Sequence, residues 1–357
     1  MKVGIDITNY VEGRAIGYNT YILNLLKGFS LLQDIETNNL VFFVRDDHAS
    51  FFAKLFPRLI FRPIKISNFF GKLLWQNFVL PFYGTYQVYL FTANFAPIFL
   101  NKRYLIVIHD LNFLKFPKNF SFISRCYRYF LIKRFINKAS VVIVDSNVIA
   151  EEVFKYTKSS SEVIYVPVPG VKISNSTDTD KHKFESDKIK ILVPSSIGEH
   201  KNITNAYLAC LNIVKASQNI EVTFIGNWQP NFFLVDERHS NIKLLGFVEF
   251  EKKADLFLNS NIVLYPSLYE GFGLPYIEAI AAQKILICSD IPIAREMAES
   301  YPIYIQAPFE SREIEVAIKK AISNIGTSNA NSSLGLLERF SPHKIALEYY
   351  EVIKNAK

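Results

Sequence analysis

Residues 261–279 decide the fold of this chain and read Asn261-Ile-Val-Leu-Tyr-Pro-Ser-Leu-Tyr-Glu270-Gly-Phe-Gly-Leu-Pro275-Tyr-Ile-Glu278-Ala. The apolar run at residues 261–266 is short enough to be a buried parallel strand. The glycines of Gly-Phe-Gly let the backbone turn tightly and approach a ligand, and Pro275 suits the first position of a helix. The pattern therefore predicts a strand, a glycine turn and a helix whose N-terminal N–H groups face a ligand such as a phosphate.

Two carboxylates lie eight positions apart around this turn. Glu270 is expected in the loop and Glu278 in the first helical turn, beside the same opening. Carboxylates at such a place can accept hydrogen bonds from sugar hydroxyls. The alternative is a plain strand–turn–helix with two solvated glutamates, which occurs often in α/β proteins. The flanking Tyr-Pro-Ser and Gly-Phe-Gly-Leu-Pro sequences favour the binding site.

The segment resembles the Glu-x7-Glu signature of retaining glycosyltransferases of the GT-B fold, in particular glycosyltransferase family 4. Residues 284–296, with their Ser-Asp-x-Pro sequence, are similar to the strand, turn and helix that follow in that family. The resemblance implies an α/β fold with two Rossmann-like, doubly wound domains facing each other across a cleft. It also implies a C-terminal helix that crosses back to the first domain.

Length and composition agree with two cytoplasmic domains. The chain has 357 residues, half of them hydrophobic, which is more than one ordinary core accommodates. No apolar run approaches the roughly 18–20 residues that span a bilayer, and the N-terminus lacks the apolar core of a signal peptide. Cys126, Cys210 and Cys288 are few, scattered and odd in number, which fits a reducing compartment and predicts neither disulfides nor a Cys-x-x-Cys metal pair.

Apolar runs alternate with helical stretches along both halves of the chain, which predicts mostly parallel sheets. The expected divisions are an acceptor-binding domain at 1–170, a polar linker at 171–188, a donor-binding domain at 189–340 and a returning helix at 341–357. The expected elements are strands at 2–7, 40–45, 86–91, 104–108, 140–145, 163–169, 190–194, 221–225, 242–245, 261–265, 285–288 and 303–305, and helices at 19–31, 122–138 and 147–158.

Residues 194–202, Pro-Ser-Ser-Ile-Gly-Glu-His-Lys-Asn, follow an expected strand and resemble the family's Gly-x-x-x-x-Arg-Lys-Asn stretch. By this resemblance Lys201 contacts the donor phosphates. His200 stands where the family usually has Arg, and Ser195 where it usually has Gly, so a weaker phosphate clamp is expected, because a neutral imidazole offers one donor and Arg a rigid fork. A surface lysine in a loop is the alternative.

The first domain should supply the opposite wall of the cleft. Gly17 closes a Gly-x-x-x-Gly turn similar to one near the donor phosphates in the family, although a plain turn is an equally good interpretation. His109 and Asp110 follow an expected strand at the edge where doubly wound sheets bind ligands. The family resemblance implies that His109 contacts the transferred sugar, and Asn94 is expected to line the cleft nearby.

Charge is unevenly distributed along the chain. Residues 1–170 contain 20 Lys/Arg and 11 Asp/Glu, a net +9, whereas the remainder contains 20 and 22, a net −2. The basic half predicts an anionic partner. The expected helix at 122–138 combines five basic residues with aromatic and aliphatic ones, so it either covers the core with one face or rests on anionic lipid, each basic residue contributing ~1 kcal/mol there.

The function implied is a retaining, metal-independent glycosyltransferase of surface-polysaccharide synthesis. It would move a mannose, rhamnose or glucose type of hexose from a nucleotide sugar to a glycan or polyprenyl-diphosphate-linked acceptor, in the cytoplasm or at the inner face of its membrane. No cofactor is implied, and Asp178-Thr-Asp180 is interpreted as solvated loop, not as a metal site.

Roles follow from the matching positions. Glu278 would hold the ribose, Glu270 the sugar hydroxyls, and Lys201 with His200 the departing diphosphate. The backbone N–H groups near the glycine turn would assist in holding the donor; they belong to Phe272, Gly273 and Leu274.

Other functions remain open on the sequence. A GT-B nucleotide-sugar epimerase would need no acceptor, and a non-catalytic nucleotide-sugar-binding protein would bind the donor without consuming it. A nucleic-acid-binding protein is suggested by charge alone, without a recognition motif. A nicotinamide-dependent oxidoreductase would need a glycine fingerprint that the chain lacks.

Overall fold

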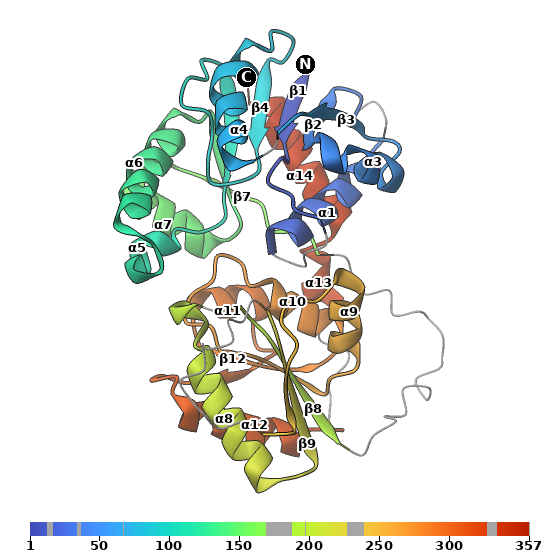
Figure 1. Ribbon diagram of the computed structural model, residues 1–357, viewed down its shortest axis with the longest axis vertical. Helices are drawn as coiled ribbons and strands as arrows, with labels where there is room; N and C mark the ends of the chain where they lie inside the picture. The colour runs from blue at the N-terminus through green and yellow to red at the C-terminus, as the bar shows by residue number, and fades with distance from the viewer. Residues whose placement is uncertain are drawn as a thin grey trace. The chain divides into compact units, whose positions relative to one another are not determined.

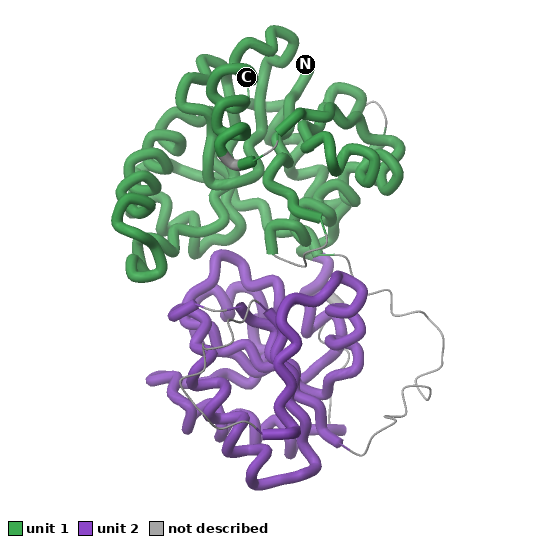
Figure 2. The backbone as a smooth tube through the Cα atoms, viewed as in Figure 1, with its two compact units in different colours: residues 1–12, 16–169, 339–357 green, residues 13–15, 170–338 purple. Residues whose placement is uncertain are grey.

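The computed structural model describes residues 1–12, 17–33, 37–66, 68–168, 188–196, 198–226, 239–326 and 334–356. The chain divides into two units (Figure 2). Unit 1 comprises residues 1–12, 16–169 and 339–357, and unit 2 comprises residues 13–15 and 170–338. The expected linker at 171–188 and the Asp178-Thr-Asp180 sequence lie almost wholly outside the described residues.

Within its described residues, unit 1 is built on a seven-stranded parallel sheet (Figure 1). The central strands β4 and β5 are apolar and buried, apart from the exposed Arg103 at the start of β5, as expected where helices cover both faces of a parallel sheet. In order across the sheet, the strands are β3 (Ile60–Ile64), β2 (Leu40–Arg45), β1 (Val3–Asp6), β4 (Val88–Phe91), β5 (Arg103–Ile108), β6 (Val141–Val144) and β7 (Glu162–Val163).

The helices of unit 1 connect these strands and cover the sheet (Figure 1). Their described members are α1 (Gly17–Ser30), α3 (Asp46–Leu55), α4 (Phe69–Leu74), η1 (Trp75–Val79), η2 (Leu80–Phe82), α5 (Asn112–Lys115), η3 (Pro117–Asn119), α6 (Phe122–Lys138), α7 (Asn147–Thr157) and α14 (Pro342–Asn355). None of the described helices in either unit has the length and apolarity needed to cross a bilayer.

Unit 2 repeats this arrangement with a six-stranded parallel sheet among its described residues. Across the sheet, the strands are β10 (Ile242–Leu244), β9 (Ile220–Ile225), β8 (Ile189–Pro194), β11 (Ile262–Tyr265), β12 (Ile285–Ser289) and β13 (Ile303–Ile305). The described helical segments are η4 (Glu199–Lys201), α8 (Ile203–Ala216), α9 (Phe250–Leu258), α10 (Leu274–Ala281), α11 (Pro292–Ala298), α12 (Ser311–Ser323) and α13 (Leu334–Glu338).

The C-terminal helix α14 returns to unit 1 and lies beside α1 (Figure 1). The hydroxyl groups of Tyr21 and Tyr349 are 2.9 Å apart in the core. Gly28 permits this close approach, because a Cβ there would lie 2.1 Å from the carbonyl oxygen of Pro342. The crossing-back helix expected from the family resemblance is therefore confirmed.

The doubly wound α/β fold is confirmed, but one expected strand is shorter than predicted and one observed strand was not predicted. The strand expected at 163–169 is limited to Glu162–Val163, followed by one further backbone hydrogen bond from Ile164 to Val144. A strand as long as expected would also have included Pro167, which lacks the N–H group that a ladder needs. Strand β3 was not expected, since Pro63 interrupts its apolar run; it lies at the edge of the sheet, where proline is tolerated.

Candidate active site

The glycine turn of unit 2 lies between strand β11 and helix α10, as the sequence predicts. Gly273 precedes the helix with a φ of 82°, and a Cβ there would lie 2.3 Å from the Tyr276 ring, so both conformation and space require glycine. The helix begins at Leu274, which makes Pro275 its second residue and not its first. Glu278 is then the fifth residue and begins the second turn, which corrects its expected place in the first turn.

A buried cation–carboxylate cluster follows the strand ends of unit 2. Lys201, at the end of η4, places its Nζ 2.6 Å from Oε1 of Glu270. The hydroxyl of Tyr265, the last residue of β11, donates to the same carboxylate oxygen at 2.5 Å. Lys201 also lies 3.2 Å from that hydroxyl. The structure thus brings together two predicted residues that are 69 positions apart, with Tyr265 as a third member.

Two backbone segments hold this cluster together. The N–H of Leu268, in the loop before Glu270, donates to the carbonyl of His200 at 2.7 Å. Asn202 follows Lys201 in the left-handed region, with a φ of 54°, and its side chain donates to the carbonyl of Phe309. Both contacts fix the η4 turn against its neighbours, so the lysine is presented to Glu270 by rigid backbone.

Lys201 and His200, the two basic residues predicted for the phosphate site, differ in their electrostatic surroundings. Burial raises the pKa of Glu270, but Lys201 and Tyr265 lower it more, so the net pKa lies below the usual value. Burial, with a smaller contribution from the Lys201 charge, lowers the pKa of His200 to about 4. His200 is therefore neutral at pH 7, and Lys201 supplies the positive charge of this cluster.

Glu278 has a separate partner on helix α9. Its Oε1 lies 2.5 Å from Nζ of Lys253, and both side chains are largely buried. Its Oε2 is buried and finds no hydrogen-bond partner among the residues that the structure describes. A buried carboxylate oxygen without a partner costs free energy. Phe272 is buried just before Gly273.

Unit 1 carries a second cluster at the carboxyl edge of its sheet. His109, directly after β5, places Nδ1 2.6 Å from Oδ2 of Asp145 and Nε2 2.8 Å from the carbonyl oxygen of Thr92. Both partners are acceptors, so only the doubly protonated ring satisfies both contacts. Burial lowers the pKa of His109, but Asp145 and the Thr92 carbonyl raise it by more than burial lowers it, so that the pKa is about 9.

The other predicted residues of unit 1 support this strand end. The Asn94 amide oxygen accepts from the backbone N–H of His109 at 2.9 Å, and its amide nitrogen donates to the carbonyl of Asp110. The carboxylate of Asp110 accepts from the N–H of Asn112 and so caps the next turn. Gly17 is exposed at the first position of α1, and residues 13–16 of its turn lie outside the described residues.

Several residues of these clusters were not predicted. Asp145 ends a strand that the sequence predicts, so its position carried a usable signal. Tyr265 lies inside the quoted motif, where the sequence predicts a strand residue but not the hydrogen bond of its hydroxyl to Glu270. Lys253 and Thr92 had no signal, because their roles depend on contacts with residues distant in sequence, Glu278 and His109.

Comparisons with known proteins show which family and which fold this chain is similar to. Residues 174–332 match the family described as glycosyl transferases group 1. The chain is 27% identical over 289 residues to the O-antigen chain mannosyltransferase RfbU of Salmonella typhimurium, covering 76% of this chain and 78% of that protein.

Solved structures share the fold across the whole chain. HepE of Anabaena, in complex with UDP and glucose, has a TM-score of 0.70 at 14% identity, covering 99% of each chain. WaaG, a glycosyltransferase involved in lipopolysaccharide biosynthesis, has a TM-score of 0.69 at 13% identity, covering 99% of this chain and 100% of that one. The two parallel-sheet units are therefore those of the GT-B fold.

Proposed function

We propose that this glycosyltransferase, with its group 1 domain at residues 174–332, builds a bacterial surface polysaccharide. It would transfer a hexose of the mannose, rhamnose or glucose type from a nucleotide sugar to a glycan or polyprenyl-diphosphate-linked acceptor. The names of two similar proteins support the pathway: RfbU is an O-antigen mannosyltransferase, and WaaG acts in lipopolysaccharide biosynthesis. HepE, a structural neighbour, binds UDP-glucose, which supports a nucleotide-sugar donor.

The donor is assigned to unit 2. Glu278 would bind the ribose hydroxyls through its unpartnered Oε2, while Lys253 holds the other oxygen. Glu270 would accept from hydroxyls of the transferred sugar. Lys201 would stabilise the departing diphosphate, together with the backbone N–H groups at the start of α10.

One observation carries this proposal: the segment that runs from β11 into α10 contains both Glu270, which pairs with Lys201 of η4, and Glu278, whose buried Oε2 has no partner in the described chain. Such unsatisfied or strongly interacting polar groups are typical of binding sites. With the positive charge of Lys201 on the departing diphosphate, leaving-group stabilisation would not depend on a divalent metal. The family resemblance implies that the anomeric configuration is retained. We infer front-face attack, in which the leaving phosphate accepts the proton of the acceptor hydroxyl, and we assign no nucleophile among the described residues.

The acceptor is assigned to unit 1, where the protonated His109 ring is held by Asp145 and Thr92. With both ring nitrogens occupied, His109 would act on a bound sugar through its positive charge and through the position of its ring. The contact of His109 with the transferred sugar, which the family resemblance implies, would then be made without a hydrogen bond from either ring nitrogen.

Membrane attachment of unit 1 would bring the enzyme to a lipid-linked acceptor. Helix α6 exposes Phe122, Ile123 and Phe130, by 70%, 81% and 69% of their surface, alongside its basic residues. Of the two interpretations of this helix, exposed apolar side chains favour contact with lipid. Sedimentation with anionic vesicles should decrease as salt increases, whereas equal recovery with neutral and anionic vesicles at low salt would contradict attachment by charge.

A donor screen tests the whole proposal. GDP-, UDP- and dTDP-sugars would be titrated calorimetrically into the wild type and into Glu278→Ala. Binding of one nucleotide class by the wild type and its loss in the variant is expected. Conversion of the bound sugar without any acceptor would instead indicate an epimerase, and binding without consumption would indicate a non-catalytic binding protein. Product anomeric configuration by NMR, with and without EDTA, tests retention and metal independence.

A further inference from the structure

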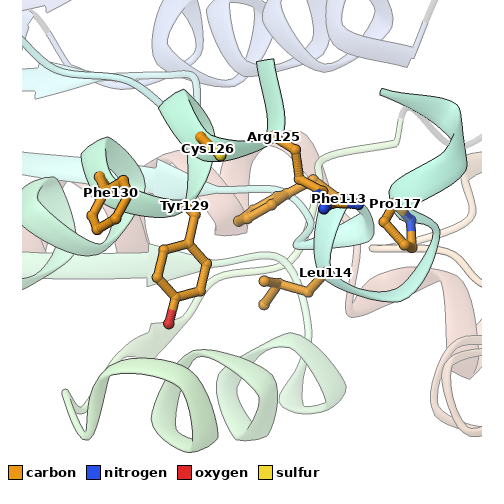
Figure 3. A pocket seen from close by; sticks show the side chains of 7 residues that line it. All are labelled: Phe113, Leu114, Pro117, Arg125, Cys126, Tyr129 and Phe130. Carbon is orange, nitrogen blue, oxygen red and sulfur yellow. The ribbon is translucent and has the colours of Figure 1, made fainter. Parts of the chain in front are cut away.

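A pocket of about 430 Å³ opens in unit 1 between the α5–η3 segment and helix α6. Figure 3 shows the side chains that line it, which come from these two parts of the chain. Its volume lies within the roughly 300–1,000 Å³ of small-molecule sites. The residues of the clusters described above do not line it, so it is a separate feature of the fold.

The pocket has a buried floor and an exposed apolar rim. Phe113 on α5 is only 1% exposed, whereas Leu114 beside it is 38% exposed and Phe130 on α6 is 69% exposed. The ring of Tyr129 lies 5.4 Å from that of Phe130. Exposed apolar side chains around a concave apolar surface favour a hydrocarbon ligand.

A positive charge lies in the same lining. The guanidinium of Arg125 stacks 5.7 Å from the Phe122 ring and, within the described parts of the chain, forms no ion pair. Lys115, on the opposite segment, is by contrast paired with Glu152. An arginine without a carboxylate partner at an apolar pocket suits a phosphate oxygen, which it can bind with two N–H groups.

The pocket is also continuous in sequence with the strand end that carries His109. Phe113 follows His109 by four residues, and Asp110 caps the turn between them through the N–H of Asn112. A ligand in the pocket would therefore contact the segment that begins at the carboxyl edge of β5. This is the edge to which we assign the acceptor.

We propose that this pocket holds the first part of the hydrocarbon chain of an anionic lipid, the lipid part of the acceptor, and that Arg125 binds its phosphate. The inference rests on the proposed function for the identity of the lipid, but not for the binding itself. The apolar lining accounts for the chain, and the unpaired guanidinium accounts for the charged head group. Exposed Phe122 and Ile123 would face the membrane from which the lipid enters.

Cys126 makes the proposal directly testable, because it lines the pocket and is partly exposed while Cys210 and Cys288 are buried. A maleimide should label Cys126 alone, and the Cys126→Ser variant should remain unlabelled. Farnesyl diphosphate below its micellar concentration should slow the labelling at least 10-fold in a saturable manner. Inorganic pyrophosphate and farnesol should each protect much less, because each supplies only half of the recognised chemistry.

Two variants separate the contributions of charge and shape. Arg125→Gln should weaken protection by farnesyl diphosphate about 10-fold while leaving the weak effect of farnesol unchanged. Leu114→Trp should fill the pocket and abolish protection, and Lys138→Gln, at the far end of α6, serves as the matched charge control. Equal protection by pyrophosphate, or none by farnesyl diphosphate, would overturn the proposal. Nucleotide-sugar titration of the same samples reports on unit 2 independently, so a failure of the donor assignment is distinguished from a failure here.

Discussion

Both units place a cation–carboxylate pair after the carboxyl ends of their strands, and in each cluster the described chain leaves one buried carboxylate oxygen without a partner, Oε2 of Glu278 in unit 2 and Oδ1 of Asp145 in unit 1. The clusters differ in how fully their cations are bound. In unit 2, Lys201 and Glu270 meet at 2.6 Å, and the nearby Glu278 retains a buried oxygen without a partner in the described chain. In unit 1, His109 uses both ring nitrogens on Asp145 and Thr92. Among the described residues, Lys201 uses two of its three N–H groups, on Glu270 and Tyr265, whereas His109 uses both of its ring N–H groups.

The difference indicates two kinds of function for similar chemistry. A cation with a remaining N–H group can bind a ligand oxygen without giving up its protein partners, as Lys201 can. A histidine with hydrogen bonds at both ring nitrogens is fixed in position and in charge, which suits a residue that maintains the shape and the charge of a binding surface. The unit 2 cluster should therefore respond to substitution mainly through donor binding and turnover, and the unit 1 cluster mainly through stability and pH.

The strongest test of this contrast is Lys201→Ala. The change removes the positive charge proposed to stabilise the leaving diphosphate, and kcat/KM should fall about 10²–10³-fold, or ~3–4 kcal/mol. It also leaves Glu270 buried without its cation, so the unfolding free energy should decrease.

Two further variants separate these effects. Lys201→Arg keeps the charge and should recover stability more than activity, because its planar fork differs from a compact ammonium. Lys319→Ala removes a lysine whose ion pair with Glu315 is largely exposed and should change neither. If Lys201→Ala retained more than half of the wild-type kcat/KM, the lysine would have no part in the chemistry.

Glu278→Gln tests the unpartnered oxygen of unit 2. Loss of a charged acceptor for the ribose hydroxyls should weaken nucleotide binding about 30-fold, or ~2 kcal/mol. Titration calorimetry with the preferred nucleotide measures this. Glu251→Gln, an exposed carboxylate on the helix that carries Lys253, is the matched control and should bind normally. Unchanged affinity in Glu278→Gln would move the ribose site elsewhere in unit 2.

The sequence predicted these two clusters unequally, for a physical reason. Apolar runs revealed the strands, and glycine and proline marked the turn into α10, because both signals are local. Lys201 and Glu270 were each identified, but their pairing depends on the register of β8 against β11 and carries no local signal. The second hydrogen bond of the His109 ring depends on the direction of the Thr92 backbone carbonyl, and a pattern of side chains does not predict the direction of a backbone carbonyl.

The unit 1 pair should appear as a pH dependence of stability. The folded pKa of His109, about 9, exceeds the ordinary value of 6.5, so its contribution is complete below pH 6.5 and is lost as pH rises through 9. Between pH 6.5 and 8 the unfolding free energy should fall by about 2 kcal/mol, at ~1.4 kcal/mol per pH unit. Urea unfolding at both pH values measures the fall.

Asp145→Asn provides the matched comparison for that measurement. It removes the charge that holds His109 protonated but keeps the shape of the side chain, so the pH dependence should shrink and the ring should titrate lower by NMR. A His109 ring that titrates near pH 6.5 in the wild type would contradict its hydrogen bonding to both Asp145 and Thr92. In that case His109 would have a nitrogen free for the sugar, and the contrast between the units would disappear.

The smallest effect is expected for His200→Arg, which tests whether a second cation beside Lys201 improves the proposed phosphate site of unit 2. His200 is neutral at pH 7, since burial and the neighbouring Lys201 lower its pKa to about 4, so it adds no charge to the proposed phosphate site. An arginine there would add a second cation with a fork that fits phosphate. Donor affinity should rise a few-fold, ~1 kcal/mol, because part of the gain is offset by repulsion from Lys201. Calorimetry at two salt concentrations would identify the gain as electrostatic, since it should decrease as salt increases. Weaker binding would instead mean that the half-buried site cannot desolvate a second charge, and that the histidine is suited to this place because it is neutral.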